Sequence, residues 1–367
     1  MLKFTLEMTI EEFVYTASKQ EIKTGSVTWI SPSNIALVKY WGKKKDQIPA
    51  NPSISFTLNN CKTTTTLEFS KKKAAGDITD FDLYFEGSSK PEFKPKINSF
   101  FARIEKYCPY IKDYKFTIST ENSFPHSSGI ASSASGMSAL ALCIMSLEKE
   151  LNPAIDEEFF NKKASFLARL GSGSACRSIE GPLIIWGKHV KTENSSDLYG
   201  SKYPYEVNDI FKNYQDTILL VDKGTKQVSS SIGHNLMHGH PFAEARFQQA
   251  HSNLEKLREI FKSGDLKAFI KIVESEALTL HAMMMSSNPY FILMKPNTLE
   301  IINRIWSFRE ETGLPVCFTL DAGANVHVLY PEKNKSEILE FIKNELVAYC
   351  EKEQYLCDEV GKGAEKL

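Results

Sequence analysis

A helix needs about 20 apolar residues to cross a bilayer, and the sequence has no apolar stretch of that length. It also has no excess of charge, because 44 lysines and arginines face 45 aspartates and glutamates, for a formal net charge of −1. We therefore expect neither a membrane anchor nor a nucleic-acid partner recruited by bulk electrostatics. The start, MLKFTLEMTIEEF, has early acidic residues and no apolar core of the secretory type, so a cytoplasmic protein is expected.

Several common binding patterns are missing as well. The seven cysteines are odd in number and form no CxxC pair, which argues against a disulfide framework and fits a reducing compartment. No HExxH motif occurs, and no residue is assigned as a metal ligand. The histidine-rich stretch GHNLMHGH, residues 233–240, is interpreted as a surface loop or helix edge, with metal binding as the alternative. No G-x-x-x-x-G-K-[ST] loop is found, so a lysine for nucleotide phosphates must come from elsewhere in the chain.

The most informative part of the chain is FPHSSGIASSASGMSALALCIMSLEKE, residues 124–150. Small residues lead directly into an apolar pattern typical of one buried helix face, formed by Met137, Leu140, Ile144 and Leu147. Small side chains leave backbone N–H groups uncovered, and a helix N-terminus adds partial positive charge. The segment therefore favours a site for nucleotide phosphates. The alternative is an ordinary helix capped by serine.

Strand and helix patterns are mixed along the chain. Strands are expected at residues 26–41, 53–70, 81–87, 114–124, 182–187, 217–222, 316–323 and 325–331. Helices are expected at residues 97–108, 132–150, 156–171, 242–264, 265–285 and 296–311, and a last helix at 335–350 is expected to close the chain. The hairpin-like strand pairs predict an α+β fold with helices packed on sheets, not a doubly wound parallel sheet.

The segment NIALVKYWGKKKDQ, residues 34–47, places a lysine where a strand ends. Strand alternation would point Lys39 and Trp41 to one face and Tyr40 to the other. A lysine on an inner face is costly to bury without an anion, so Lys39 is expected to face a carboxylate or an anionic ligand. The alternative is an edge strand protected by lysines.

Two later segments carry further candidates. In ARLGSGSACRSIEGP, residues 168–182, two hydroxyls and a guanidinium (Ser172, Ser174 and Arg177) lie within one loop-to-helix turn, which suits an anion such as a carboxylate. The alternative is a capped helix with an exposed arginine. In FTLDAGAN, residues 318–325, Asp321 follows an apolar strand, a common place for a catalytic acid or base, although aspartate is also a frequent turn former.

Four strings, NIALVKYWGK, FPHSSGIASSASG, ARLGSGSACRS and FTLDAGAN, together resemble the characteristic strings of the diphosphomevalonate decarboxylases, which are relatives of the GHMP kinases. The resemblance runs from about Ser26 to the C-terminus. It implies a GHMP-kinase fold, with a ribosomal-S5-domain-2-like lobe at residues 27–212 and a ferredoxin-like lobe at 213–367. The active site would lie in the cleft between the lobes. Residues 1–26 would be an N-terminal extension without a family counterpart.

The resemblance also implies a reaction and its cofactors. Members of this family use ATP, with Mg²⁺, to phosphorylate the 3-hydroxyl of mevalonate 5-diphosphate. Loss of that phosphate and of CO2 then gives isopentenyl diphosphate, in the mevalonate pathway of isoprenoid biosynthesis. Departure of phosphate leaves positive charge at C3, which a nearby carboxylate stabilises. Family members are commonly cytoplasmic homodimers, so the same is expected here.

The family roles fall on matching residues of this chain. Asp321 would lie at the reacting hydroxyl, Arg177 would hold the substrate carboxylate, and Lys39 would approach the aspartate and the transferred phosphate. The residues expected to hold the substrate diphosphate are Tyr40, Lys43, Ser172 and Ser174, next to Arg177. The residues expected at the ATP phosphates are Ser127, Ser128, Gly129, Ser132, Ser133 and Lys226. Mg²⁺ would be held mostly by phosphate oxygens and water.

Three parts of the sequence depart from the family pattern. His126-Ser127-Ser128 stands where Thr-Ala-Ala is common, Pro52 where serine is usual, and Ala324 where proline is usual. The alternatives are a mevalonate 3-kinase that releases no CO2, a decarboxylase of other mevalonate phosphates, another GHMP-type kinase, or an inactive nucleotide-binding protein. The presence of Asp321, Lys39 and Arg177 favours decarboxylation.

Overall fold

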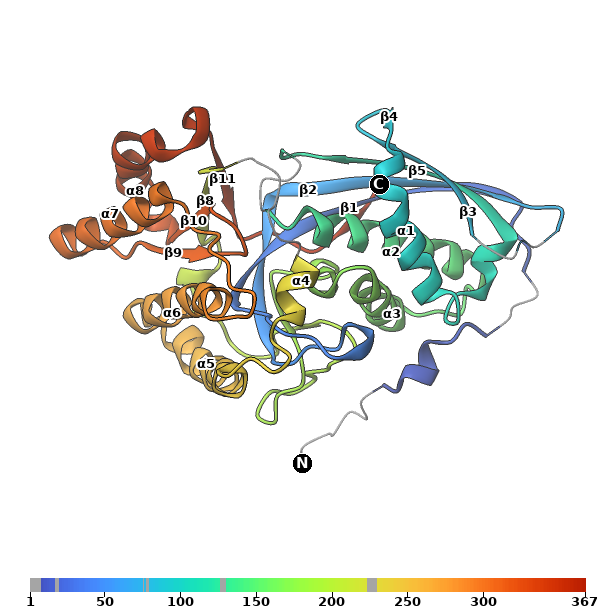
Figure 1. Ribbon diagram of the computed structural model, residues 1–367. Helices are drawn as coiled ribbons and strands as arrows, with labels where there is room; N and C mark the ends of the chain where they lie inside the picture. The colour runs from blue at the N-terminus through green and yellow to red at the C-terminus, as the bar shows by residue number, and fades with distance from the viewer. Residues whose placement is uncertain (1–7, 17–19, 75, 77–78, 126–129, 223–229) are drawn as a thin grey trace.

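The computed structural model describes residues 8–16, 20–74, 76, 79–125, 130–222 and 230–367. The chain forms two lobes that lie side by side, each built on its own sheet (Figure 1). The mixed α+β class predicted from the sequence is confirmed. Within these described residues, no helix combines the length and the apolar character needed to cross a membrane.

The first lobe is built on a long antiparallel pair, β1 (Thr24–Val38) and β2 (Ser53–Lys71). Buried and more exposed residues alternate along the threonine-rich half of β2, because one face of this sheet is packed and the other is open. The sheet continues with β5 (Tyr114–Asn122), β3 (Asp80–Phe85) and β4 (Ser88–Ser89), while β6 (Leu183–Trp186) pairs with β2 and β7 (Ser201–Lys202) pairs with β6.

Three helices cover the packed face of this sheet (Figure 1): α1 (Lys94–Ile104), α2 (Ser132–Leu151) and α3 (Glu157–Gly171). Almost every residue of α2 beyond its first turn is buried, as expected for a helix that is apolar nearly all round. The N-terminal extension is docked onto this lobe, since the fully buried Phe13 stacks on Phe166 of α3 with ring centroids 4.4 Å apart. The 3-10 turn that carries Phe13, Ile10–Phe13, therefore packs against α3.

The second lobe has a four-stranded antiparallel sheet in the order β11, β8, β10, β9. Its strands are β8 (Gln215–Leu219), β9 (Cys317–Leu320), β10 (Val326–Tyr330) and β11 (Tyr355–Glu359). Its helices are α4 (Ser230–Asn235), α5 (Ala243–Ser263), α6 (Leu266–Met285), α7 (Pro296–Thr312) and α8 (Lys335–Phe341). Gly264 and Gly313 end α5 and α7 with φ angles of 77° and 71°, a left-handed conformation that favours glycine.

The expected run at residues 53–70 lies in one strand, β2, although Asn59 and Asn60 have no partner in β1 and their backbone N–H groups donate to Asp358. One detail of the expected chain course is wrong. The last helix does not close the chain, since a π-helical turn at Ile342–Leu346 follows α8, and β11 and β12 (Glu365–Lys366) come after it. Lys366 pairs with Trp29 of β1, so the C-terminal residues return to the first sheet. These short, polar strands lack the apolar alternation that marks a strand in sequence.

A fully buried ion pair holds the backbone of Lys39. Arg246 of α5 and Glu276 of α6 are both 0% exposed, and their Nη2 and Oε2 atoms lie 2.6 Å apart. The N–H of Lys39 donates to Glu276 at 2.9 Å, and its carbonyl accepts from Arg246 at 3.0 Å. Asn253 donates to the second carboxylate oxygen of Glu276. The second lobe thus fixes the residue at the end of β1.

Replacement of Arg246 by methionine is expected to destabilise the protein by about 3–5 kcal/mol, because it leaves the Glu276 carboxylate buried and unpaired. It should also lower turnover by displacing Lys39. Denaturant unfolding and a kinetic assay measure the two effects. Lys163→Met is the matched control, since Lys163 and Glu148 form an equally buried pair at 2.5 Å in the first lobe. It should cost similar stability with little loss of turnover. A wild-type unfolding midpoint for Arg246→Met would show that the Arg246–Glu276 pair does not stabilise the fold.

Candidate active site between the lobes

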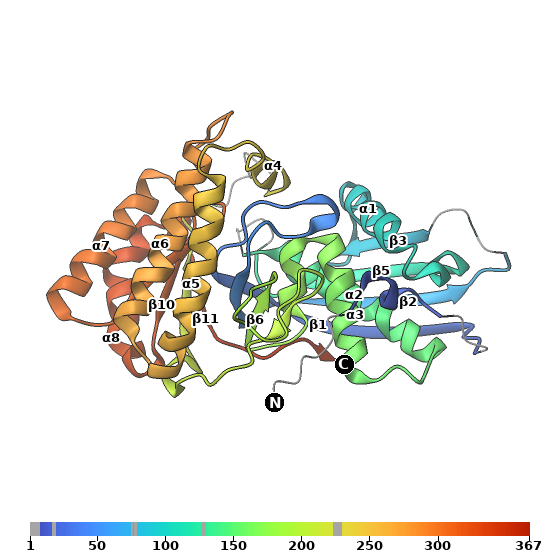
Figure 2. The same cartoon turned by 90° about the horizontal axis from the view of Figure 1, so that it is seen from below.

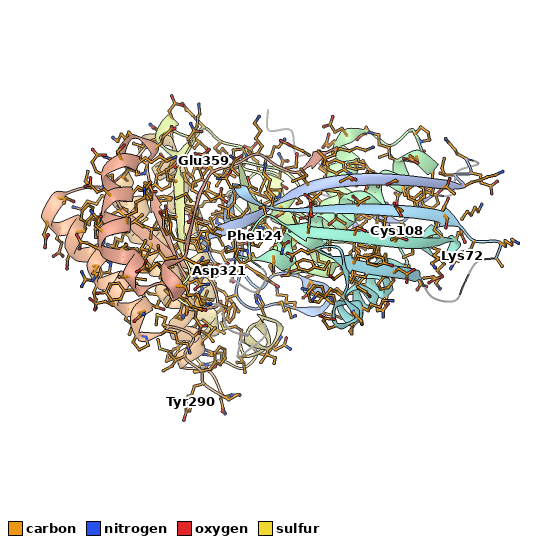
Figure 3. The ribbon with its side chains drawn as sticks, turned by 90° about the horizontal axis from the view of Figure 1, so that it is seen from above. Lys72, Cys108, Phe124, Tyr290, Asp321 and Glu359 are labelled. Carbon is orange, nitrogen blue, oxygen red and sulfur yellow. The ribbon has the colours of Figure 1, made fainter. Side chains whose placement is uncertain are left out.

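An ion pair joins the two lobes where two strands end. Lys39 follows β1 and Asp321 follows β9, and the Lys39 Nζ lies 3.0 Å from the Asp321 Oδ1. The lysine side chain is 2% exposed and the aspartate 33%, so the carboxylate reaches the surface of the cleft while its partner is enclosed. Asp321 lies at the junction of the lobes in Figure 3. The anion that the sequence demanded for Lys39 is therefore an internal carboxylate.

The surroundings of this pair set its protonation and position. Burial lowers the pKa of Lys39, and the Asp321 carboxylate opposes that shift. His281 of α6 donates from Nε2 to the backbone carbonyl of Asp321 at 3.1 Å. Burial lowers the pKa of His281 to about 4, so the ring is neutral near pH 7 and serves as a fixed donor. The turn that carries Asp321 is thereby tied to α6.

Arg177 is held by two polar side chains of the first sheet. It lies in the 3-10 helix η5 (Gly173–Ser178) and is buried. Its Nη1 donates to the Ser53 hydroxyl at 2.6 Å. Its Nε and Nη2 donate to the side-chain amide oxygen of Asn34, Oδ1, at 3.4 and 3.3 Å. Burial lowers its pKa, an effect that Cys176 and Asp321 oppose. Neither Asn34 nor Ser53 was predicted as a site residue, although Asn34 begins the segment NIALVKYWGKKKDQ and Ser53 begins the expected strand that became β2.

A cavity of about 440 Å³ opens beside these groups. It brings together most of the predicted site residues: Lys39, Tyr40, Lys43, Ser133, Ser172, Ser174, Arg177 and Asp321. The expected alternation of side chains does not reach this segment, because β1 ends at Val38, and Tyr40 and Trp41 therefore line the same cavity as Lys39. Burial raises the pKa of Tyr40, which stays a neutral hydroxyl donor.

The cavity is strongly cationic, and part of that charge was not predicted. Lys96 and Arg103 of α1 join the three predicted cations on its wall. Among the lining residues that the structure describes, Asp321 is the one carboxylate. The seven-residue spacing puts Lys96 and Arg103 on one face of α1, but the helix expected from the sequence began at residue 97 and so excluded Lys96. Such a wall favours a ligand with several negative charges.

A second, mostly apolar cavity of about 240 Å³ adjoins the first. Its wall comes from α1, α2 and strands β2, β3 and β5, and it includes Ser132 and Ser133 at the start of α2. Ser133 and Lys96 line both cavities, so the two are continuous at the predicted phosphate loop. The other residues predicted for this loop and its lysine lie outside the described residues: Ser127, Ser128, Gly129 and Lys226.

The histidine-rich segment was expected to be a surface loop or a helix edge. His234 lies in α4, but it and His240 are buried and His234 lines the cationic cavity, so the surface loop is wrong. The Gly42 N–H donates to the His234 Nδ1 at 3.0 Å. Histidine spacing alone gives no sign of this contact, because Gly42 lies 192 residues earlier in the chain.

A two-lobed α+β fold with a cationic cavity between the lobes is the GHMP-kinase fold that the resemblance implied. Residues 31–197 match the family model of the diphosphomevalonate decarboxylase-like N-terminal domain. Residues 217–365 match that of the mevalonate 5-diphosphate decarboxylase C-terminal domain. The chain belongs to the diphosphomevalonate decarboxylase family.

Individual relatives agree with this assignment. Diphosphomevalonate decarboxylase ERG19 of Gibberella zeae is 28% identical over 326 residues, covering 84% of this chain and 82% of that protein. Phosphomevalonate decarboxylase of Haloferax volcanii is 26% identical, covering 83% and 88%. The solved structure of MDDEF in complex with MVAPP, AMPPCP and magnesium has a TM-score of 0.79 and 28% identity, covering 94% of this chain and 99% of that one.

The buried lysine gives a test that needs no assay of turnover. In protein labelled with [13Cε]lysine, the resonance of Lys39 should titrate below the ordinary lysine value of 10.5, because burial disfavours its charged form. Lys43, whose pKa burial and Arg103 also lower, should give a second such resonance. Each should vanish in Lys39→Arg or Lys43→Arg, respectively. If the resonance lost in Lys39→Arg titrated at or above 10.5, the proposed environment of Lys39 would be wrong.

Proposed function

We propose that this chain catalyses the ATP-dependent decarboxylation of mevalonate 5-diphosphate to isopentenyl diphosphate. The observation that carries the proposal is that Asp321, Lys39 and Arg177 meet at one cationic cavity between the lobes. The substrate has a carboxylate at one end and a diphosphate at the other, so it is a polyanion of the kind such a wall favours. Membership of the family supports the same reaction.

Asp321 would act at C3 of the substrate. It would first orient the 3-hydroxyl toward the γ-phosphate of ATP. The hydroxyl oxygen would then bond to the γ-phosphorus as the bond to ADP breaks, and the hydroxyl proton would pass through the Asp321 carboxylate to solvent, which leaves that carboxylate ionised. When the C3–O bond breaks and the phosphate departs with its electron pair, positive charge develops on the carbon. The C–C bond to the carboxylate then breaks, its electrons form the new double bond, and CO2 departs. The carboxylate of Asp321 stabilises the charge that builds up between these events.

Arg177 and Lys39 would hold the two other reacting groups. Arginine has five N–H donors, and Ser53 and Asn34 engage three of those of Arg177, so two are left among the described residues for the substrate carboxylate. Lys39 would neutralise charge on the transferred phosphate, as a loop lysine does in other phosphoryl-transfer enzymes. Tyr40, Lys43, Ser172 and Ser174 would hold the diphosphate.

The nucleotide would occupy the apolar cavity, with its phosphates reaching toward Asp321. The adenine would pack against the α2 residues Met137 and Leu140, and the phosphates would pass Ser133 and Lys96. Ser127, Ser128, Gly129, Ser132 and Lys226 would complete this site. Mg²⁺ would arrive on the phosphate oxygens and water, since the described residues contain no group of three or more His, Cys, Asp or Glu side chains suited to hold a metal.

Other features that the resemblance implies stay proposals. These are the homodimer, the cytoplasmic location and the division of the chain after residues 26 and 212. The boundaries lie near the starts of β1 and β8, at Thr24 and Gln215, while β12 returns to the first sheet.

A stoichiometric assay tests the reaction. ADP and trapped CO2 are measured with mevalonate 5-diphosphate, and the proposal predicts one CO2 for each ADP. ADP without CO2 would instead identify a 3-kinase, and nucleotide binding with no turnover would identify an inactive relative. Mevalonate 5-phosphate is the comparison substrate, because one relative is a phosphomevalonate decarboxylase. The diphosphate should have the higher kcat/KM, since its extra charge meets the cationic wall.

Asp321→Asn should lower kcat by about a thousandfold or more, because the amide no longer stabilises the charge at C3. Binding of mevalonate 5-diphosphate, measured by calorimetry, should change by less than about threefold. Asp209→Asn, at an exposed aspartate paired with Lys212, is the matched control and should leave both values as they are. Near-normal turnover in Asp321→Asn would remove this residue from the mechanism.

Gly136→Phe tests the nucleotide cavity. A Cβ at Gly136 would meet nothing within 4 Å, so the ring would enter the cavity without displacing backbone. The KM for ATP should rise about tenfold or more, since the adenine loses apolar contact area of the order of a buried ring. The KM for mevalonate 5-diphosphate should stay near the wild-type value. Gly136→Ala should show a much smaller effect, and wild-type ATP affinity in Gly136→Phe would place the adenine elsewhere.

A further inference from the structure

His234 is enclosed between two aromatic side chains at the edge of the cationic cavity. Its ring centroid lies 4.1 Å from that of Tyr40 and 4.7 Å from that of Trp41, and the residue is 8% exposed. The preceding Gly233 packs directly on Trp41, since a Cβ there would come within 2.5 Å of the indole. Figures 1 and 2 show α4, which carries both residues, beside the segment that follows β1. The position of the ring is therefore fixed by packing.

One hydrogen bond also fixes where the ring carries its proton. The backbone N–H of Gly42 donates to Nδ1 at 3.0 Å, so Nδ1 is the acceptor and the proton of the neutral ring is on Nε2. Burial, together with the charges of Lys43 and Arg177, lowers the pKa of His234 to about 3. The ring is therefore a neutral Nε2–H donor across the physiological range.

This donor has no partner within the described part of the chain, and its ring lines the same cavity as Lys43 and Ser172. The Nε2 atom is not one of the fully buried polar atoms without a partner, so it is accessible from the cavity, where an oxygen of a bound ligand can accept its hydrogen bond. The charges that act on the ring are those of Lys43 and Arg177, which places it at the cationic side of the cavity. A phosphate oxygen is the acceptor that fits this position.

We propose that His234 donates a hydrogen bond from Nε2 to a phosphate oxygen of the substrate's diphosphate, next to Tyr40 and Lys43. This inference rests on the proposed function, because it takes mevalonate 5-diphosphate as the ligand. His234 adds directional recognition without adding charge, while Lys43 supplies the charge. It is a binding residue, and the reacting atoms at C3 are not its target.

Two amide variants separate the role of Nδ1, which accepts from Gly42, from that of Nε2, the proposed donor to the ligand. In His234→Gln the side-chain amide N–H takes the place of Nε2–H and keeps the donor. In His234→Asn the shorter side chain can accept from Gly42 but does not reach the ligand. The dissociation constant for mevalonate 5-diphosphate should rise about tenfold or more in His234→Asn, as expected for a lost bond to a charged group, and less than about threefold in His234→Gln. The kcat value should change by less than about threefold in both.

The control is His238→Asn, at an exposed histidine in the same segment, which should bind the substrate as the wild type does. If His234→Asn does not fold, His234→Phe keeps the ring packing and removes the donor. Equal affinity in the His234 variants and the wild type would overturn the inference alone, as would a loss in His234→Gln with normal affinity in His234→Asn. A wild-type protein that binds no mevalonate 5-diphosphate would overturn the proposed function as well.

Discussion

The contact between Lys39 and Asp321 is the point on which both lobes converge. Each residue follows the last residue of a strand, in a different sheet, and the two meet at 3.0 Å. A buried ammonium is unfavourable without an anion, and a carboxylate that is to stabilise a cationic carbon must stay ionised. Each group thus supplies the charge that the other needs. Correct docking of the lobes and assembly of the reacting centre become the same event.

Buried polar side chains hydrogen-bond the backbone of both Lys39 and Asp321, although burying such groups is unfavourable unless they are paired. Arg246 and Glu276 form hydrogen bonds with the backbone of Lys39, and His281 forms one with the backbone carbonyl of Asp321. Replacing a buried ion pair by apolar residues is often neutral or stabilising, so such a pair is weak evidence for a role in stability. Here the pair hydrogen-bonds the backbone N–H and carbonyl of Lys39 directly, so it fixes the position of a residue proposed to act in the reaction.

The sequence predicted features that depend on residues close together in the chain better than features that depend on contacts between distant segments. Local patterns predicted the strand before Lys39, the helix after the phosphate loop and the turn at Asp321, because apolar periodicity and small-residue runs are written within one segment. The resemblance to a family then linked distant segments. The features that were missed depend on contacts between distant segments. The burial of His234 is one, and the hydrogen bonds from Arg246 and Glu276 to the backbone of Lys39 are another, since no local pattern indicates either. The polar strand β12 was missed because its partner, β1, lies more than 300 residues earlier.

The most direct test of this account is a double-mutant cycle on kcat/KM with Lys39→Met, Asp321→Asn and the combined variant. If the two side chains act as one unit, the second substitution adds little, and the combined variant should lie within about threefold of the more damaged single variant. If the losses of the two single variants multiply in the combined variant, the two groups act independently and the account is contradicted.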